Sequence, residues 1–269
     1  LAQLNRLQPD IPADASAISI NSPKADYDKA ETEKSLKYLE EGGRLLVAMD
    51  FQSGLARNLN DMLASYGVGF DFGVVVEMNK NYNTGNPFHA APDFAPHEIT
   101  APLQEQNTPA ILQFAQGIRQ LDVRRRTIEI APLLATSKDS FLRIDLANNS
   151  PSLVETDKPG PILVAAAVRE QPENSPGRET RIVVIGSGTL LEPLNPFGQI
   201  PGNIDIFMNG ITWLQDRPET LAVRSKSLIT MPMNVTGLHI IIFALLFVGV
   251  IPIALFGAGL FTWLKRRHL

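Results

Sequence analysis

Polar side chains that could bind a ligand follow two apolar runs of the sequence. Asp50 and Ser53 come after the run 44–49, and Ser187 stands between two glycines after the run 181–185. In open α/β sheets, ligands bind in the crevice outside the carboxyl ends of the strands. These three residues are therefore candidates for a polar crevice, in which Ser187 would present its hydroxyl to an anion. Ordinary turn and helix-cap chemistry is the alternative explanation of the same residue types.

The sequence contains none of the motifs that would indicate covalent catalysis. The chain has no cysteine, which excludes a thiol nucleophile, a disulfide framework and cysteine-ligated metals. Gly186-Ser187-Gly188 does not fit the G-x-S-x-G pattern of a hydrolase, and no G-x-x-x-x-G-K-S/T pattern is present to bind ATP. The sequence predicts a non-enzymatic protein without a cofactor.

Three residues spaced by four, His89, Asp93 and His97, would share one face of a helix and could ligate a metal there. Pro92 and Pro96 lie inside the same window, and proline does not fit the interior of a regular helix. We therefore expect solvated loop histidines at these positions and no metal site.

A short basic run, Arg124–Arg126, precedes a stretch predicted as a strand. These side chains could contact lipid headgroups or an acidic partner. A solvated strand edge that resists unwanted pairing is the simpler expectation.

The composition limits the class of protein. The 269 residues are 44% hydrophobic and 19% charged, which is enough to bury a full core. Residues 1–234 hold 21 Lys and Arg against 28 Asp and Glu, so the body of the chain is mildly acidic. This balance argues against a nucleic-acid-binding surface.

The segment 238–264 contains 27 residues without Asp, Glu, Lys or Arg. As a helix it would extend about 40 Å, more than the roughly 30 Å hydrocarbon core of a bilayer. We expect a transmembrane helix in the range 235–264, with Trp263 at the interface.

Positive charge indicates how this helix is oriented. Lys265, Arg266 and Arg267 follow the apolar run directly and would anchor a cytoplasmic tail at 265–269. By the positive-inside rule, residues 1–234 then form an extracytoplasmic domain at a bacterial cytoplasmic (inner) membrane.

Patterns in the first third of the body predict alternating strands and helices. A strand at 17–22 precedes a helix that begins at Asp28, with Glu31 at capping-box spacing. Continuous apolar runs then predict buried strands at 44–50 and 74–76, separated by a second amphipathic helix. The order strand, helix, strand is typical of a right-handed parallel crossover.

Repeated prolines interrupt the pattern between residues 79 and 157, and we predict a loop-rich insertion there. Short strands are expected within it near 128–130 and 141–144. Beyond it, the patterns predict strands at 162–168 and 181–185 and a helix from Asn203.

Five segments carry a family resemblance over most of the chain. They are SLKYLEEGGRLLVAMD at 35–50, HEIT at 97–100, APLLATSKDSF at 131–141, RIVVIGSGTLL at 181–191 and NIDIFMNGITWL at 203–214. Followed by one apolar helix and a basic end, they resemble the auxiliary (GldG-like) subunit of gliding-motility-type ABC transporters. The family pattern commonly begins with a membrane helix and earlier strands that this sequence lacks, so we expect part of the natural N-terminus to be missing.

The resemblance implies an α/β fold of the flavodoxin-like or amidotransferase-like kind: a mostly parallel sheet with a loop-rich β insertion, plus one C-terminal transmembrane helix. It also implies a non-catalytic accessory subunit of an ABC-2-type transport complex. Its expected partners are the permease and ATPase subunits, membrane lipid and other envelope proteins. Two alternatives stay open: an envelope enzyme or sugar-binding protein of amidotransferase-like fold, and a purely structural scaffold.

Overall fold

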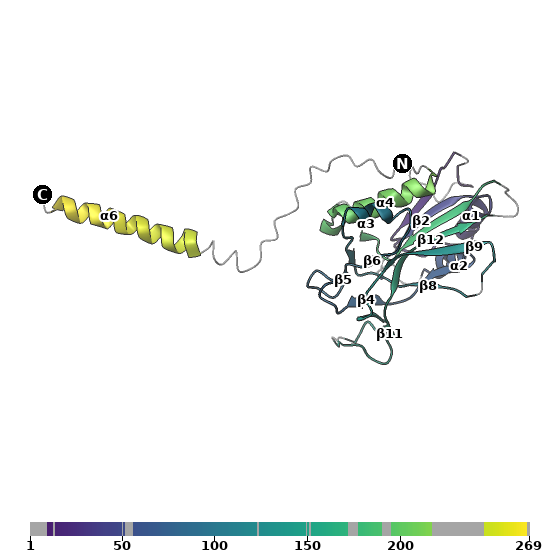
Figure 1. Cartoon of the computed structure of the whole chain (residues 1–269), viewed down its shortest axis with the longest axis horizontal. Coiled ribbons are helices and arrows are strands. Elements are labelled where there is room, and N and C mark those ends of the chain that lie inside the picture. The colour runs from purple at the N-terminus through teal and green to yellow at the C-terminus, as the bar shows by residue number, and fades with distance from the viewer. Residues whose placement is uncertain are drawn as a thin grey trace. The chain divides into compact units, whose positions relative to one another are not determined.

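The structure is a computed structural model that describes most of the chain. The described residues are 10–12, 14–49, 51, 56–122, 124–148, 150, 152–171, 177–189, 195–216 and 245–267. The chain divides into two compact units, Leu1–Val223 and Arg224–Leu269, and each is considered by itself. The first unit is a mixed α/β domain, with helices packed on a central sheet (Figure 1).

The central sheet has six strands in the order β1-β2-β13-β12-β9-β6. Their bounds are β1 Ile18–Asn21, β2 Arg44–Ala48, β13 Thr180–Ile185, β12 Leu163–Glu170, β9 Ile128–Ala135 and β6 Asp93–Phe94. β2 pairs in parallel with β1 and with β13, whereas the β13–β12, β12–β9 and β9–β6 pairs are antiparallel. The sheet is thus mixed, where the sequence predicted a mostly parallel one. The reason is that β12 and β13 are consecutive strands paired across a short polar connection, which requires antiparallel pairing.

The two faces of the sheet are covered by different helices. α1 Lys29–Glu40 and α2 Arg57–Ala64 pack on one face, and α3 Ala101–Glu105 and α4 Pro201–Leu214 on the other. The predicted capping box is confirmed: the Glu31 backbone N–H donates to the Asp28 carboxylate, and the Asp28 N–H donates to the Glu31 carboxylate. α1 ends at Glu40, and Gly42 in the turn that follows has a φ of 83°, a left-handed conformation that glycine adopts without strain.

Alternation along the strands separates two hydrophobic cores. In β2, Leu46 and Ala48 point to the core beneath α4, and Leu45 and Val47 point to the core beneath α1 and α2. The α4 core also contains Trp213, which is 1% exposed. The central strands are buried on both faces, and this explains why their sequences are continuous apolar runs.

The region 79–157 contributes more to the sheet than the predicted insertion would. Both expected strands are present, but β9 extends to Ala135 and joins the central sheet beside β12. The other strands form smaller sheets, namely β4 Val74–Glu77, β10 Ser140–Arg143 and β11 Lys158–Pro159 in one, β3 Val68–Phe70 with β8 Ile118–Gln120, and β5 His89–Ala90 with β7 Leu112–Gln113. A short 3-10 helix, η3 Pro196–Gln199, precedes α4.

A single arginine organises the long connection between β10 and β11. The Arg143 guanidinium donates to the Asp157 carboxylate at 2.9 Å and to the backbone carbonyls of Asn148, Ser150 and Ser152. Asp157 also accepts from the Val154 N–H at 3.0 Å, and both charged side chains are buried. The connection therefore has a polar centre in place of an apolar core.

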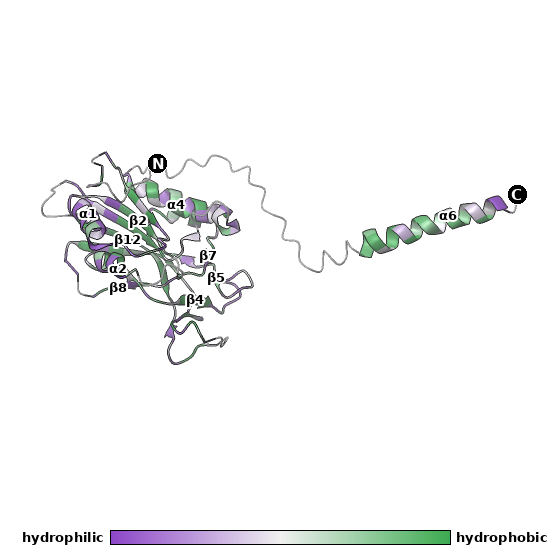
Figure 2. Cartoon of the chain, turned by 180° about the vertical axis from the view of Figure 1, so that it is seen from behind, coloured by the Kyte–Doolittle hydropathy of each residue, from purple (hydrophilic) through white to green (hydrophobic). Residues whose placement is uncertain are grey.

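The second unit is helical over its described length. η5 Leu245–Val250 is a π-helix, and α6 Ile251–Arg267 continues from it. Figure 2 shows α6 as mainly apolar, with a hydrophilic C-terminal end. Within the described residues, none of the helices combines the length and the hydropathy needed to cross a bilayer. Residues 235–244 of the predicted transmembrane segment lie outside the described residues.

Candidate functional site

The structure describes one of the three residues predicted to form a crevice at the strand ends. Asp50 and Ser53 lie outside the described residues, so the crevice itself stays a prediction. Ser187 is fully buried. Its hydroxyl donates to the Gln113 carbonyl at 3.1 Å and shares a hydrogen bond of 2.9 Å with the Thr189 hydroxyl. Ser187 therefore ties the end of β13 to β7, and this geometry does not present a nucleophile to a substrate.

Close packing explains the glycine that follows Ser187. A Cβ atom at Gly188 would lie 1.5 Å from Ser22 Oγ, in the turn that follows β1. The turn after β1 and the end of β13 thus pack closely through the Ser22 side chain. Neither Gly186 nor Gly188 has a positive φ, so close packing, and not the backbone freedom of a turn, accounts for glycine at these positions.

The three residues spaced by four have different surroundings. His89 lies within 3.5 Å of polar atoms of Thr84, Asn86 and Gln113, and its ring meets Phe197 edge-on at 4.6 Å. Asp93 belongs to the edge strand β6. Among the described residues, no group of three or more His, Asp or Glu side chains is arranged to hold a metal ion.

His97 instead helps to hold α4 on the sheet, together with two other segments of the family resemblance. Its Nδ1 accepts from the Ile99 N–H at 3.1 Å, and its ring meets Trp213 of α4 at 5.3 Å. Asn209 of α4 donates to the Ile99 carbonyl at 3.0 Å. From β13, Arg181 donates to the Trp213 carbonyl at 2.6 Å, which satisfies a carbonyl at the C-terminal end of the helix. The motifs HEIT, RIVVIGSG and NGITWL therefore converge on one packing site.

The half-buried imidazole of His97 makes the stability of the domain depend on pH. Burial lowers the pKa of His97 below its ordinary value of 6.5; Glu98 opposes this shift and Arg169 adds to it. The unfolded chain takes up a proton near pH 6.5 that the folded chain accepts only at lower pH. The free energy of unfolding should therefore fall as the pH drops below 6.5.

We expect His97→Asn to make this pH dependence shallower in urea unfolding measured from about pH 5 to about pH 7. The asparagine amide oxygen can still accept from the Ile99 N–H, so the turn is preserved while the titrating group is removed. Burial also lowers the pKa of His89, so part of the slope should remain. An unchanged slope in the variant would contradict the assignment to His97.

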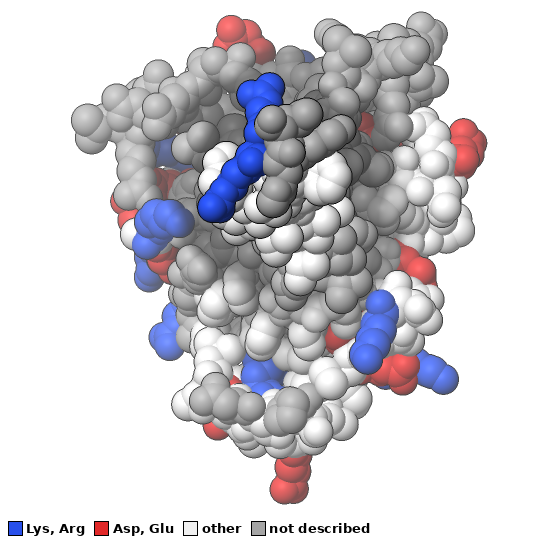
Figure 3. All heavy atoms as spheres, turned by 90° about the vertical axis from the view of Figure 1, so that its left-hand side faces the viewer, with Lys and Arg blue, Asp and Glu red and all other residues white. Residues whose placement is uncertain are grey.

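The basic run Arg124–Arg126 is partly engaged by the body of the domain. Arg125 pairs with the buried Glu170 at 2.8 Å and lies over the Tyr66 ring, and Arg124 donates to the Leu121 carbonyl. On the face that Figure 3 shows, blue and red side chains are intermixed among the described residues.

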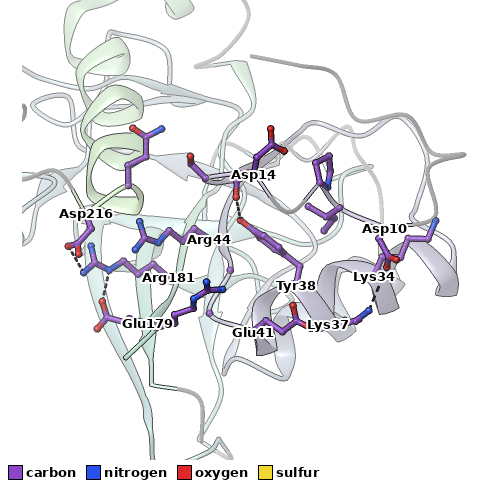
Figure 4. A pocket seen from close by; sticks show the side chains of 18 of the residues that line it. Asp10, Asp14, Lys34, Lys37, Tyr38, Glu41, Arg44, Glu179, Arg181 and Asp216 are labelled. Atoms are coloured by element: carbon purple, nitrogen blue, oxygen red, sulfur yellow. Dashed lines mark hydrogen bonds and ion pairs between the residues drawn. The ribbon is translucent and has the colours of Figure 1, made fainter. Parts of the chain in front are cut away.

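A polar cleft of about 680 Å³ lies at the amino-terminal edge of β2 and β13, opposite to the predicted crevice. It is bordered by residues 10–16, the end of α1, the turn into β2, residues 177–181 and the end of α4. Figure 4 shows Arg44 and Arg181 entering the cleft from neighbouring strands, with Tyr38 of α1 beside them. Burial raises the pKa of Tyr38. A hydrogen bond with the backbone of Arg44 and the positive charge of Arg44 both oppose this shift.

Most charged groups of the cleft have partners within the domain. Arg181 forms ion pairs with Glu179 and Asp216, and Lys37 lies 3.7 Å from Asp10. Arg44 is half-buried, yet it has no carboxylate partner among the described residues. Charged side chains of both signs thus border the described part of the cleft, and no histidine is among them.

Sequence reasoning missed this cleft because its borders come from four separate segments of the chain. One signal was nevertheless available. The two apolar runs that were predicted as parallel strands both begin with arginine, at Arg44 and Arg181. Strands that pair in parallel with aligned ends place such residues side by side, and the structure pairs these two directly.

Comparison with known proteins identifies the family. A sequence model of the family described as "ABC-type uncharacterized transport system" matches residues 2–201. No curated protein matches the chain at a significant level. Among solved structures, the chain is similar to the "mmIFT52 N-terminal domain", with 20% sequence identity, a TM-score of 0.49, and coverage of 73% of this chain and 76% of that one. Because the family match covers well over half of its length, the chain belongs to this family and is an auxiliary component of an ABC-type transport system.

Proposed function

We propose that the chain is a non-catalytic accessory subunit that is held in a membrane by its C-terminal apolar run and contacts substrate or partner proteins through its α/β domain. Family membership supports a role beside transport subunits. The five sequence segments support the finer assignment to the gliding-motility type. Its partners would be the permease and the ATPase, since the chain itself has no P-loop sequence.

The observation that carries the membrane proposal is the apolar surface of the described C-terminal unit. Val248 and Phe256 are each 77% exposed, and Leu255 is 68% exposed. Side chains of this kind would be covered by lipid, which removes about 25 cal/mol per Å² of apolar surface from water. Arg266 and Arg267 at the end of α6 favour a cytoplasmic tail, with the α/β domain outside the cytoplasm of a bacterial cell.

Membrane anchoring predicts that the full chain resists extraction by alkaline carbonate and is released by detergent. Val248→Lys together with Leu255→Lys should release it, because each lysine near the centre of a membrane helix costs about 3 kcal/mol. Met208→Lys on the exposed face of α4 is the matched control and should leave the chain in the membrane. Carbonate release of the unchanged protein would refute the anchor.

The absence of cysteine allows a direct test of orientation. A single cysteine replacing Ser152 marks the α/β domain, and one replacing Leu269 marks the tail. A membrane-impermeant maleimide applied to cells with a permeabilised outer membrane should label the first position and spare the second. Labelling of the tail alone would reverse the proposed orientation. Purification in detergent should recover the permease and the ATPase of the same system with the chain.

A further inference from the structure

Three arginines stand in a row across the amino-terminal edge of the sheet. Arg181 of β13 is the direct register partner of Arg44 in β2 and of Arg169 in β12. Side chains two residues apart on a strand point to the same face of the sheet. Leu46 lies two residues after Arg44 and Val183 two residues after Arg181, and both belong to the core beneath α4. The arginines in the row therefore share the α4 face of the sheet. Like charges placed directly opposite each other on neighbouring strands are destabilising. Each of these guanidinium groups therefore needs compensation.

Two members of the row are compensated within the domain. Arg169 pairs with Glu98 at 3.0 Å, and Arg181 pairs with Asp216 at 2.9 Å. Their guanidinium carbons lie 5.0 and 5.1 Å from the centroid of the Trp213 ring, close enough for cation–π attraction.

Arg44, the third member, lacks both kinds of compensation among the residues that the structure describes. No carboxylate lies within ion-pair distance of it, and no ring lies within cation–π distance. In Figure 4, dashed interactions reach Arg181, whereas none is drawn to Arg44. A half-buried guanidinium beside another cation is an unfavourable arrangement unless an anion joins it.

The remaining residues of the cleft leave room for such an anion. Arg178 is exposed and has no partner among the described residues, and its Cβ packs against Gly42, two residues before Arg44. The two carboxylates of the cleft without partners, Asp14 and Glu41, are exposed, so water solvates them. The uncompensated charge that is withdrawn from solvent is thus positive.

We propose that this cleft is a binding site for an anionic oxygen group, a phosphate or a carboxylate, held by Arg44 with Arg178 as a second contact. The planar guanidinium offers a fork of N–H donors that matches both groups in a two-pronged geometry. The volume of about 680 Å³ accommodates a ligand larger than the anion itself. The inference does not depend on the proposed transport role.

The test uses the full chain in a neutral detergent and measures binding by titration calorimetry and by the thermal unfolding midpoint. Inorganic phosphate and succinate are the two probes, at matched ionic strength in chloride. We expect at least one of them to bind and to raise the midpoint, and their relative affinities distinguish the phosphate source from the carboxylate source. Failure of both to bind would overturn the proposal.

Variants then assign the site. Arg44→Gln should weaken binding of the effective probe by about tenfold or more, and Arg178→Gln should weaken it to a smaller extent. Arg119→Gln is the control, because Arg119 is exposed, pairs with Asp71 and lies on β8, away from the cleft. Binding that is unchanged in Arg44→Gln would also overturn the proposal.

Stability without ligand separates a binding role from a structural one. Removing one of two opposed cations relieves repulsion, so Arg44→Gln should leave the midpoint of the ligand-free chain unchanged or raise it. A lowered midpoint in Arg44→Gln would show that Arg44 supports the fold, so that its weaker binding could not be assigned to a lost contact. The proposal would then depend on Arg178, which is exposed. If Arg178→Gln bound the probe with unchanged affinity, the proposal would be overturned.

Discussion

Replacing Trp213 by alanine is expected to lower the free energy of unfolding of the α/β domain by about 3–5 kcal/mol, the range found for large aromatic side chains removed from a core. Trp213 is 1% exposed and packs between α4 and the sheet. Its loss would leave a cavity and would also deprive Arg169 and Arg181 of the ring that they share. Urea unfolding of the full chain in detergent, followed by circular dichroism, measures the effect.

Two further variants show how much of the loss comes from the buried packing of the Trp213 ring. Trp213→Phe keeps an aromatic ring and should cost only about 1 kcal/mol, since the indole N–H is buried without a hydrogen-bond partner. Met208→Ala removes a large side chain from the exposed face of the same helix and should cost less than about 0.5 kcal/mol. Equal losses for Trp213→Ala and Met208→Ala would contradict the role assigned to Trp213.

Arg143→Met is expected to destabilise the domain by about 3–5 kcal/mol, because it leaves the buried carboxylate of Asp157 without its cation. It also removes the arginine donor from the carbonyls of Asn148, Ser150 and Ser152, of which the Ser152 carbonyl keeps the Ser150 hydroxyl at 3.2 Å. Limited proteolysis should then cut within residues 144–157 under conditions in which the unchanged domain is intact.

Double substitution tests the interaction itself. Adding Asp157→Asn to Arg143→Met should recover part of the lost stability, because the uncompensated buried charge is then absent. Arg119→Met breaks an ion pair whose arginine is exposed and whose partner, Asp71, keeps Lys158 at 2.9 Å, so it should change stability by less than about 1 kcal/mol. If Arg119→Met lowered the free energy of unfolding as much as Arg143→Met, burial of the Arg143–Asp157 pair would not explain the expected loss of stability.

The sequence predicted the elements of the fold wherever one local rule decides. Asp28 and Glu31 mark the start of α1, and the apolar runs at β2 and β13 mark strands buried on both faces. Strand order was beyond local rules, because β9 joins the central sheet through pairing with β12, more than 30 residues further along the chain. Parallel or antiparallel direction follows from such pairings and therefore could not be fixed in advance for the whole sheet.

The sites were less predictable than the fold. Ser187 has the residue type and the place of a ligand-binding turn, yet it is fully buried, with its hydroxyl bonded to the Gln113 carbonyl and the Thr189 hydroxyl. The sequence patterns do not single out Trp213, and only tertiary structure brings Arg169, Arg181 and His97 against its ring. Arg44 likewise becomes a candidate binding residue only when the structure places it opposite Arg181 on the neighbouring strand.

Residues 10–12 and 14–16 border the same cleft as the end of α4, so the two ends of the described part of the domain lie close together. Domains with adjacent ends are suited to insertion into other proteins, and their original ends can be joined by a short linker in a circular permutant. Such a module can be added to or removed from a larger assembly without separating the sequences that flank it.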